Sequence, residues 1–90
     1  MTTIAIVGAG LIGRSWAFVF ARAGLAVRVW DADPAVLARL SGDIATMIAD
    51  AGADPAIAAR ITAFPTLAEA LEGAGWVQEN GPENAAVKRA

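Results

Sequence analysis

Three glycines near the start of the chain have the spacing of a turn that binds phosphate groups. Gly8, Gly10 and Gly13 follow the apolar run Ile4–Val7 at once, in the pattern G-x-G-x-x-G. We expect Gly8 to turn the chain sharply out of a strand, Gly10 to leave room for a pyrophosphate against the backbone, and Gly13 to let a helix pack closely. The start of that helix would present unpaired N–H groups and the positive end of its dipole to the phosphates.

An acid follows at the distance that nucleotide-binding units require. Asp31 comes directly after a second apolar run, Ala26–Trp30, and such an acid lies about 20 residues beyond the glycines. A carboxylate there accepts hydrogen bonds from the hydroxyls of an adenosine ribose and repels the additional phosphate of NADP. We therefore predict NAD as the cofactor. The predicted cofactor-binding residues of this segment are Gly8, Gly10, Leu11, Ile12, Gly13 and Asp31.

The same residues leave other interpretations open. A strand–helix–strand unit can carry a tight glycine turn without any ligand, and an acid at a strand end often caps the next helix instead. Gly13 followed by Ala17 also matches FAD-binding domains, which usually end the second strand with a glutamate. Arg14 could contact a phosphate, but a solvated helix arginine is the better interpretation.

The composition limits the chain to one small globular unit. It has 90 residues, 57% of them hydrophobic, which is enough for a packed core but short for a complete six-stranded doubly wound sheet. The absence of cysteine excludes disulfides and thiolate metal sites. A net charge of −2 without a basic cluster argues against nucleic-acid binding. No apolar stretch suits a membrane span and no signal-peptide pattern precedes the first strand, so we expect a cytoplasmic protein.

The hydrophobic pattern alternates between strands and helices. We expect strands at Ile4–Val7, Ala26–Trp30, Ile61–Phe64 and Trp76–Glu79. We expect helices at Leu11–Ala23, Pro34–Ala51, Pro55–Arg60, Leu67–Leu71 and from Glu83 onward. Asp33 as N-cap with Pro34 at the first helical position should begin the second of these helices, and Gly52 should end it. This alternation predicts a Rossmann-type α/β fold, an incomplete doubly wound parallel sheet with strand order 3-2-1-4. The loops 8–13 and 80–83 would then meet at the carboxyl edge of the sheet.

Two further expectations concern surfaces. The first helix carries an apolar stripe that we expect to face the sheet, with Trp16 in the core. The stripe consists of Ile12, Trp16, Val19, Phe20 and Ala23. The strand Trp76–Glu79 is expected to keep one unpaired edge, and unpaired edges recruit other chains. We therefore expect a homo-oligomer, such as a dimer.

Essentially the whole chain resembles the L-3-hydroxyacyl-CoA dehydrogenase superfamily, which includes L-gulonate 3-dehydrogenase (lambda-crystallin) and carnitine dehydrogenase. The residues that carry the resemblance are Ile61–Ala70 and, more specifically, Val77-Gln78-Glu79 followed by Pro82-Glu83 and Lys88. It implies an NAD-dependent oxidoreductase of fatty acid metabolism that oxidises the 3-hydroxyl of a 3-hydroxyacyl-CoA. It also implies that Glu83 and Lys88 hold the nicotinamide end of NAD, a spacing that suits the start of a helix.

The chain departs from that superfamily in two respects. The family's catalytic pair is a histidine oriented by a glutamate, and this sequence contains no histidine. We therefore expect residues 1–90 to be the N-terminal part of a dinucleotide-binding domain, without a catalytic residue or the helical substrate domain, and inactive alone. Asp43, Asp50 and Asp54 occupy the region where CoA-using members place serine and lysine, which favours a small non-CoA substrate. A non-catalytic dinucleotide-binding module is a further alternative.

Overall fold

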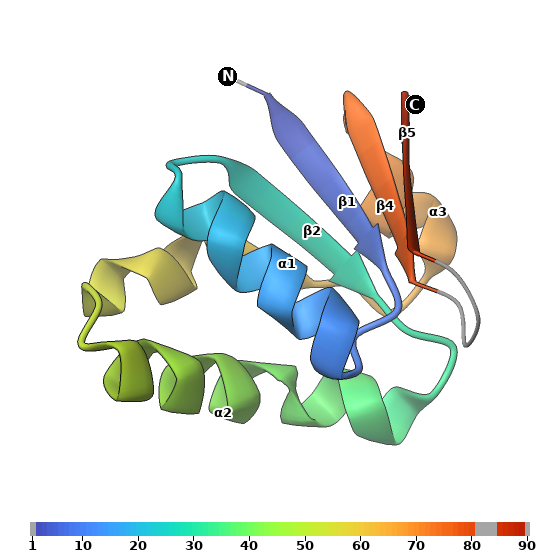
Figure 1. Cartoon of the computed structure of the whole chain (residues 1–90). Coiled ribbons are helices and arrows are strands. Elements are labelled where there is room, and N and C mark those ends of the chain that lie inside the picture. The colour runs from blue at the N-terminus through green and yellow to red at the C-terminus, as the bar shows by residue number, and fades with distance from the viewer. Residues whose placement is uncertain (1, 81–84, 90) are drawn as a thin grey trace.

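The computed structural model describes residues 2–80 and the backbone of residues 85–89 (Figure 1). Among these residues five strands form one sheet in the order β3-β2-β1-β4-β5. The strands are β1 (Thr3–Val7), β2 (Ala26–Trp30), β3 (Ile61–Ala63), β4 (Trp76–Asn80) and β5 (Ala85–Arg89). The helices are α1 (Leu11–Arg22), α2 (Pro34–Ala51), the 3-10 helix η1 (Pro55–Arg60) and α3 (Leu67–Leu71). The Rossmann-type α/β fold and the parallel order 3-2-1-4 are confirmed.

The boundaries of α2 follow the cap residues that the sequence predicts. Asp33 accepts a hydrogen bond of 2.9 Å from a backbone N–H of the first turn, and Pro34 occupies the first helical position. Gly52 ends the helix in the left-handed conformation with a φ of 62°. These local signals fix where the chain leaves the end of β2 and where it returns toward β3.

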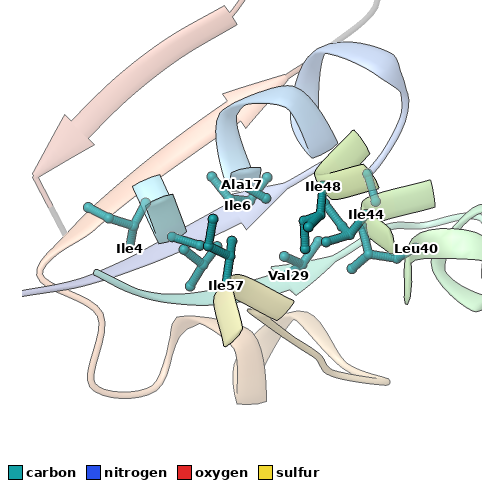
Figure 2. Packing of buried hydrophobic residues seen from close by; sticks show 11 residues of the cluster. Ile4, Ile6, Ala17, Val29, Leu40, Ile44, Ile48 and Ile57 are labelled. Atoms are coloured by element: carbon teal, nitrogen blue, oxygen red, sulfur yellow. The ribbon is translucent and has the colours of Figure 1, made fainter. Parts of the chain in front are cut away.

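The core lies between the sheet and the layer formed by α1, α2 and η1, while α3 covers the other face (Figure 1). Branched residues of β1 and β2 meet branched residues of α2 and η1 there, as Figure 2 shows. The cluster contains Ile4, Ile6, Ala9, Ala17, Ala21, Val27, Val29, Leu40, Ile44, Ile48 and Ile57. This packing fixes β1 and β2 side by side, so their carboxyl ends hold a constant separation.

Most of the apolar stripe of α1 faces solvent. The expectation that it packs on the sheet is wrong for Ile12, Trp16, Val19 and Ala23, while Phe20 is partly buried against the core. The sheet-facing residues are Gly13, Ala17 and Ala21. Ile12 is 56% exposed, Val19 50% and Trp16 38%, and Trp16 stacks on Phe20 with ring centroids 5.5 Å apart. Small residues face inward because they let the helix axis approach the sheet closely. The helical period reveals both the stripe of large apolar residues and the stripe of small ones, but it does not show which of the two faces the sheet.

The C-terminal segment is a strand, so the helix predicted from Glu83 onward is wrong over residues 85–89. β5 pairs antiparallel with β4, with Trp76 opposite Arg89 and Asn80 opposite Ala85. An open edge of β4 would leave N–H and C=O groups unpaired, and pairing with β5 satisfies them. The predicted unpaired edge of β4 is therefore also wrong, and self-association no longer follows from it. In the part of the chain that the structure describes, no helix has the length and apolar character of a membrane span.

Candidate dinucleotide-binding site

The carboxyl ends of β1, β2 and β4 surround a cavity of about 450 Å³. Its lining residues are Gly8, Gly10, Leu11, Ile12, Gly13, Asp31 and Asn80. β1 lies between β2 and β4, so the direction of strand order reverses at this point, where ligands of open α/β sheets bind. The structure thus brings together every residue of the segment 8–31 that the sequence nominates for cofactor binding.

Gly8 and Gly13 allow α1 to begin directly against the ends of two strands. Gly8 has a φ of 99°, a conformation that favours glycine. A Cβ on Gly8 would also lie 2.8 Å from the backbone oxygen of Asn80. A Cβ on Gly13 would overlap the carbonyl oxygen of Gly8. No other residue type fits either position without a shift of the backbone.

Gly10 stands at the open side of the same turn. It is the N-cap of α1, makes no side-chain cap hydrogen bond, and no acid follows in the first turn of this helix of 12 residues. A Cβ on Gly10 would meet no atom within 4 Å. Unpaired N–H groups at a helix start, next to free space, are what a pyrophosphate requires. The residues present therefore fit the phosphates of a dinucleotide.

Asp31 joins the glycine turn to the loop after β2. Its Oδ2 accepts from the N–H of Ala9 at 2.6 Å, and its Oδ1 accepts from the N–H of Asp33 at 2.7 Å. Each carboxylate oxygen keeps a further lone pair that can accept from a ribose hydroxyl. The alternative in which Asp31 caps the next helix is not what the structure shows, because Asp33 is that cap.

A second cavity, of about 590 Å³, has Asp31 in its wall as well. Mainly apolar side chains line it: Trp30, Asp31, Ala32, Pro34, Leu37, Ala38, Ala63, Phe64 and Pro65. Since both cavities share Asp31, a ribose bound at this carboxylate would direct a base into the apolar cavity and phosphates toward the glycine turn. The two cavities together match the three parts of an adenosine diphosphate group.

The arginines near the site are engaged elsewhere. Arg28 donates to the carbonyl oxygens of Glu69 at 2.7 Å and Ala70 at 3.3 Å, and its guanidinium carbon lies 3.9 Å from the ring centroid of Phe64. The Arg14 guanidinium lies 3.9 Å from a carboxylate oxygen of Asp43 on α2. These contacts support the interpretation of Arg14 as a surface arginine, and they hold Arg28 at the end of α3 rather than beside Asp31.

Asn80 is a site residue that the sequence analysis missed. Its Nδ2 donates to the carbonyl oxygens of Val7 at 3.3 Å and Gly8 at 3.4 Å, and its Oδ1 accepts from Nε2 of Gln78 at 3.1 Å. The sequence places an asparagine in the loop expected to meet the glycine turn. No spacing rule, however, shows that a side chain at the end of β4 binds the carbonyls at the end of β1.

The other two residues predicted to bind the cofactor are Glu83 and Lys88. Glu83 falls outside the described residues. The backbone of Lys88 belongs to β5 and lies opposite Val77, near the amino end of β4. The argument from helical spacing for this pair does not hold, because residues 85–89 form a strand. Within the described residues no group of three or more histidine, cysteine or acidic side chains could hold a metal ion.

After β1 comes a glycine turn whose N–H groups can donate to phosphates, and after its neighbour β2 comes a carboxylate that can accept from a ribose. These features define the class, a Rossmann-type dinucleotide-binding domain. Comparison with protein families identifies the family within this class. Residues 3–90 match the family described as 3-hydroxyacyl-CoA dehydrogenase, NAD binding domain, and the chain belongs to this family. Its cofactor is therefore NAD, and the FAD alternative is excluded.

Known proteins of several kinds share this unit. The chain is 38% identical to the lambda-crystallin homolog of Bos taurus, over 96% of this chain and 30% of that protein. It is also 38% identical to the L-carnitine dehydrogenase of Nocardiopsis dassonvillei, over 96% of this chain and 27% of that protein. The solved structure of (S)-3-hydroxybutyryl-CoA dehydrogenase from Ralstonia eutropha matches with a TM-score of 0.77 and 27% identity, over 93% of this chain and 32% of that one. The chain thus spans less than a third of each.

Proposed function

We propose that the chain is the NAD-binding segment of an oxidoreductase that oxidises the 3-hydroxyl group of a 3-hydroxyacyl-CoA. One observation carries the proposal: the glycine turn and Asp31 face the same cavity in a chain of this dehydrogenase family. The similarity to a 3-hydroxybutyryl-CoA dehydrogenase supports the substrate class. Bound NAD supplies the hydride acceptor, and the residues of this chain hold and orient it.

Each part of the site has a proposed role. The N–H groups at the start of α1, exposed by Gly10, bind the pyrophosphate. Asp31 accepts from the adenosine ribose, and the apolar cavity beside it takes the adenine. Leu11 and Ile12 are 68% and 56% exposed at the mouth of the cleft, where they offer apolar contact to the cofactor. Glu83 stays proposed for the nicotinamide end on the family resemblance. Lys88 does not, because its backbone lies opposite Val77, near the amino end of β4, and the cavity lies at the carboxyl ends of the strands.

A second candidate is the oxidation of a small hydroxy compound that carries no CoA. The similarity to an L-carnitine dehydrogenase and to a lambda-crystallin homolog favours it. The acidic residues Asp43, Asp50 and Asp54 also favour it, because a surface rich in carboxylates disfavours the phosphates of CoA. A third candidate, a dinucleotide-binding module without catalysis, needs nothing beyond the site described above.

Activity assays on the whole protein separate these candidates. We propose that the substrate domain and the catalytic pair lie outside residues 1–90, in a cytoplasmic enzyme. The whole protein should then reduce NAD with a 3-hydroxyacyl-CoA, whereas the 90-residue chain, as the matched control, should give no turnover because it has no histidine base. Turnover of L-carnitine or L-gulonate alone would select the second candidate. Turnover by the chain itself would contradict the assignment of catalysis to other residues.

Asp31 is expected to select NAD over NADP. Its carboxylate repels a 2′-phosphate, and Arg28 is held on the carbonyls of α3, where it cannot neutralise one. Asp31→Ala should weaken NAD binding by about 1–3 kcal/mol, the value of hydrogen bonds to a charged group. Calorimetric titration of both cofactors checks this, with Asp50→Ala on the exposed side of α2 as a control. Equal or tighter binding of NADP by the unsubstituted chain would refute the assignment.

We also propose that the protein is a homo-oligomer. Trp16 and Val19 form an exposed apolar surface on α1, away from the cofactor cavity, and such surfaces commonly bind another protein surface. A second copy packed through the same surface would bury it. Trp16→Glu should shift the mass measured by light scattering toward the monomer. An unsubstituted chain that is monomeric at high concentration would contradict the proposal.

A further inference from the structure

We propose that Asn80 is a positioning residue of this site, whose side-chain amide holds the glycine turn in the shape that a pyrophosphate needs. The proposal rests on the proposed binding of NAD at the turn, and it assigns a task to a residue of β4 that is remote from the G-x-G-x-x-G pattern. Asn80 is partly buried and lines the same cavity as Gly10 and Asp31.

The Asn80 side chain extends the pairing of β1 and β4 by one step. The parallel register between these strands ends with Val7 opposite Glu79. At this end of β1 the carbonyl oxygens of Val7 and Gly8 accept hydrogen bonds from Nδ2 of Asn80, at 3.3 and 3.4 Å. The turn is therefore fastened to the neighbouring strand at the point where backbone pairing stops.

The contacts fix which way the Asn80 amide points. Carbonyl oxygens only accept hydrogen bonds, so the Nδ2 group must face Val7 and Gly8, and Oδ1 must face Gln78. Gln78 is 1% exposed and donates to that oxygen through Nε2 at 3.1 Å. Among the described residues its own Oε1 has no hydrogen-bond partner. A buried acceptor left unpaired costs stability. The hydrogen bond from Gln78 holds Oδ1 of Asn80 away from the carbonyl groups of the turn.

One peptide group of the turn is held at both ends. The carbonyl of Gly8 and the N–H of Ala9 belong to the same planar unit, and in a trans peptide they point in opposite directions. The carbonyl receives Nδ2 of Asn80, and the N–H donates to Asp31 at 2.6 Å. Gly8, with a φ of 99°, has the freedom to let this unit rotate. Without Asn80, rotation would turn a carbonyl oxygen toward the space that the phosphates occupy.

The test compares ligands with and without a pyrophosphate. Asn80→Ala removes the donor, and Thr46→Ala, which removes an exposed hydroxyl of α2, is the matched control. We expect Asn80→Ala to weaken NAD binding about tenfold, while adenosine, held by Asp31 and the apolar cavity, changes by less than about twofold. Amide exchange of Ala9 in the ligand-free chain should become about tenfold faster, because this N–H loses a fixed orientation toward Asp31.

Other outcomes overturn the proposal. If Asn80→Ala binds NAD within about twofold of the unsubstituted chain, the glycine turn does not need the hydrogen bonds of Asn80 to keep its shape. An equal loss for NAD and adenosine would reduce Asn80 to a general structural role. If the unsubstituted chain binds no NAD, the proposed function fails. The amide exchange of Ala9 in the ligand-free chain then still tests whether Asn80 holds the turn. An amide exchange rate of Ala9 that is unchanged in both Asn80→Ala and the isosteric Asn80→Asp would refute the proposed role of Asn80.

Discussion

Gly13→Ala is expected to destabilise the whole unit formed by β1 and α1. The added Cβ would overlap the carbonyl oxygen of Gly8 and lie 2.7 Å from its carbonyl carbon and 3.2 Å from Nδ2 of Asn80. The first two are backbone atoms, so rotation of a side chain cannot relieve the overlap. α1 must move away from the sheet, which loosens the packing of Ala17 and Ala21.

The expected loss is large relative to the stability of a small domain. Overpacking in a core costs about 1–3 kcal/mol and more when backbone must move, against a total of about 5–15 kcal/mol. Denaturant unfolding followed by circular dichroism measures it. Gly42→Ala is the matched control, because a Cβ there meets no atom within 4 Å and alanine favours the interior of α2. Equal stability of Gly13→Ala and the unsubstituted chain would show that α1 is not packed as described.

Gly10→Val should abolish NAD binding while leaving the fold intact. The turn has no atom within 4 Å of a Cβ on Gly10, and its φ of −68° and ψ of −165° are open to valine. The side chain would then occupy the free space that we assign to the pyrophosphate. The expected loss of affinity is at least about a hundredfold, since phosphate contacts at the helix start are lost together.

Fold and binding are measured on the same material. The melting curve of Gly10→Val should stay close to that of the unsubstituted chain, while calorimetric titration with NAD should give no saturable signal. Gly10→Ala, which adds one methyl group at the same point, should fall between the two in affinity. A valine variant that binds NAD as the unsubstituted chain does would mean that the turn shapes the fold and holds no phosphate.

Features set by neighbouring residues were predictable from the sequence. The cap Asp33 with Pro34, the terminating Gly52 and the glycines of the turn act within a few residues of themselves, and the structure shows them as expected. The strand order followed as well, because right-handed crossovers leave few alternatives.

Features set by distant parts of the chain were not predictable. The inward face of α1 depends on how closely a helix can approach the sheet, so Trp16 was placed on the wrong side. β5 exists because the edge of β4 is available to pair, which residues 85–89 do not reveal on their own. Asn80 and Gln78 gained their roles from β1, far away in sequence but adjacent in the sheet.

The central claim is that NAD binds between the glycine turn and Asp31. A titration of the isotope-labelled chain with NAD, followed residue by residue through the backbone amide resonances, tests it most directly. We predict saturable changes at residues 8–13 and at Asp31, with no change at Gly42 on the exposed part of α2. A folded chain whose amides at residues 8–13 do not respond to NAD, or respond no more than Gly42, would contradict the claim.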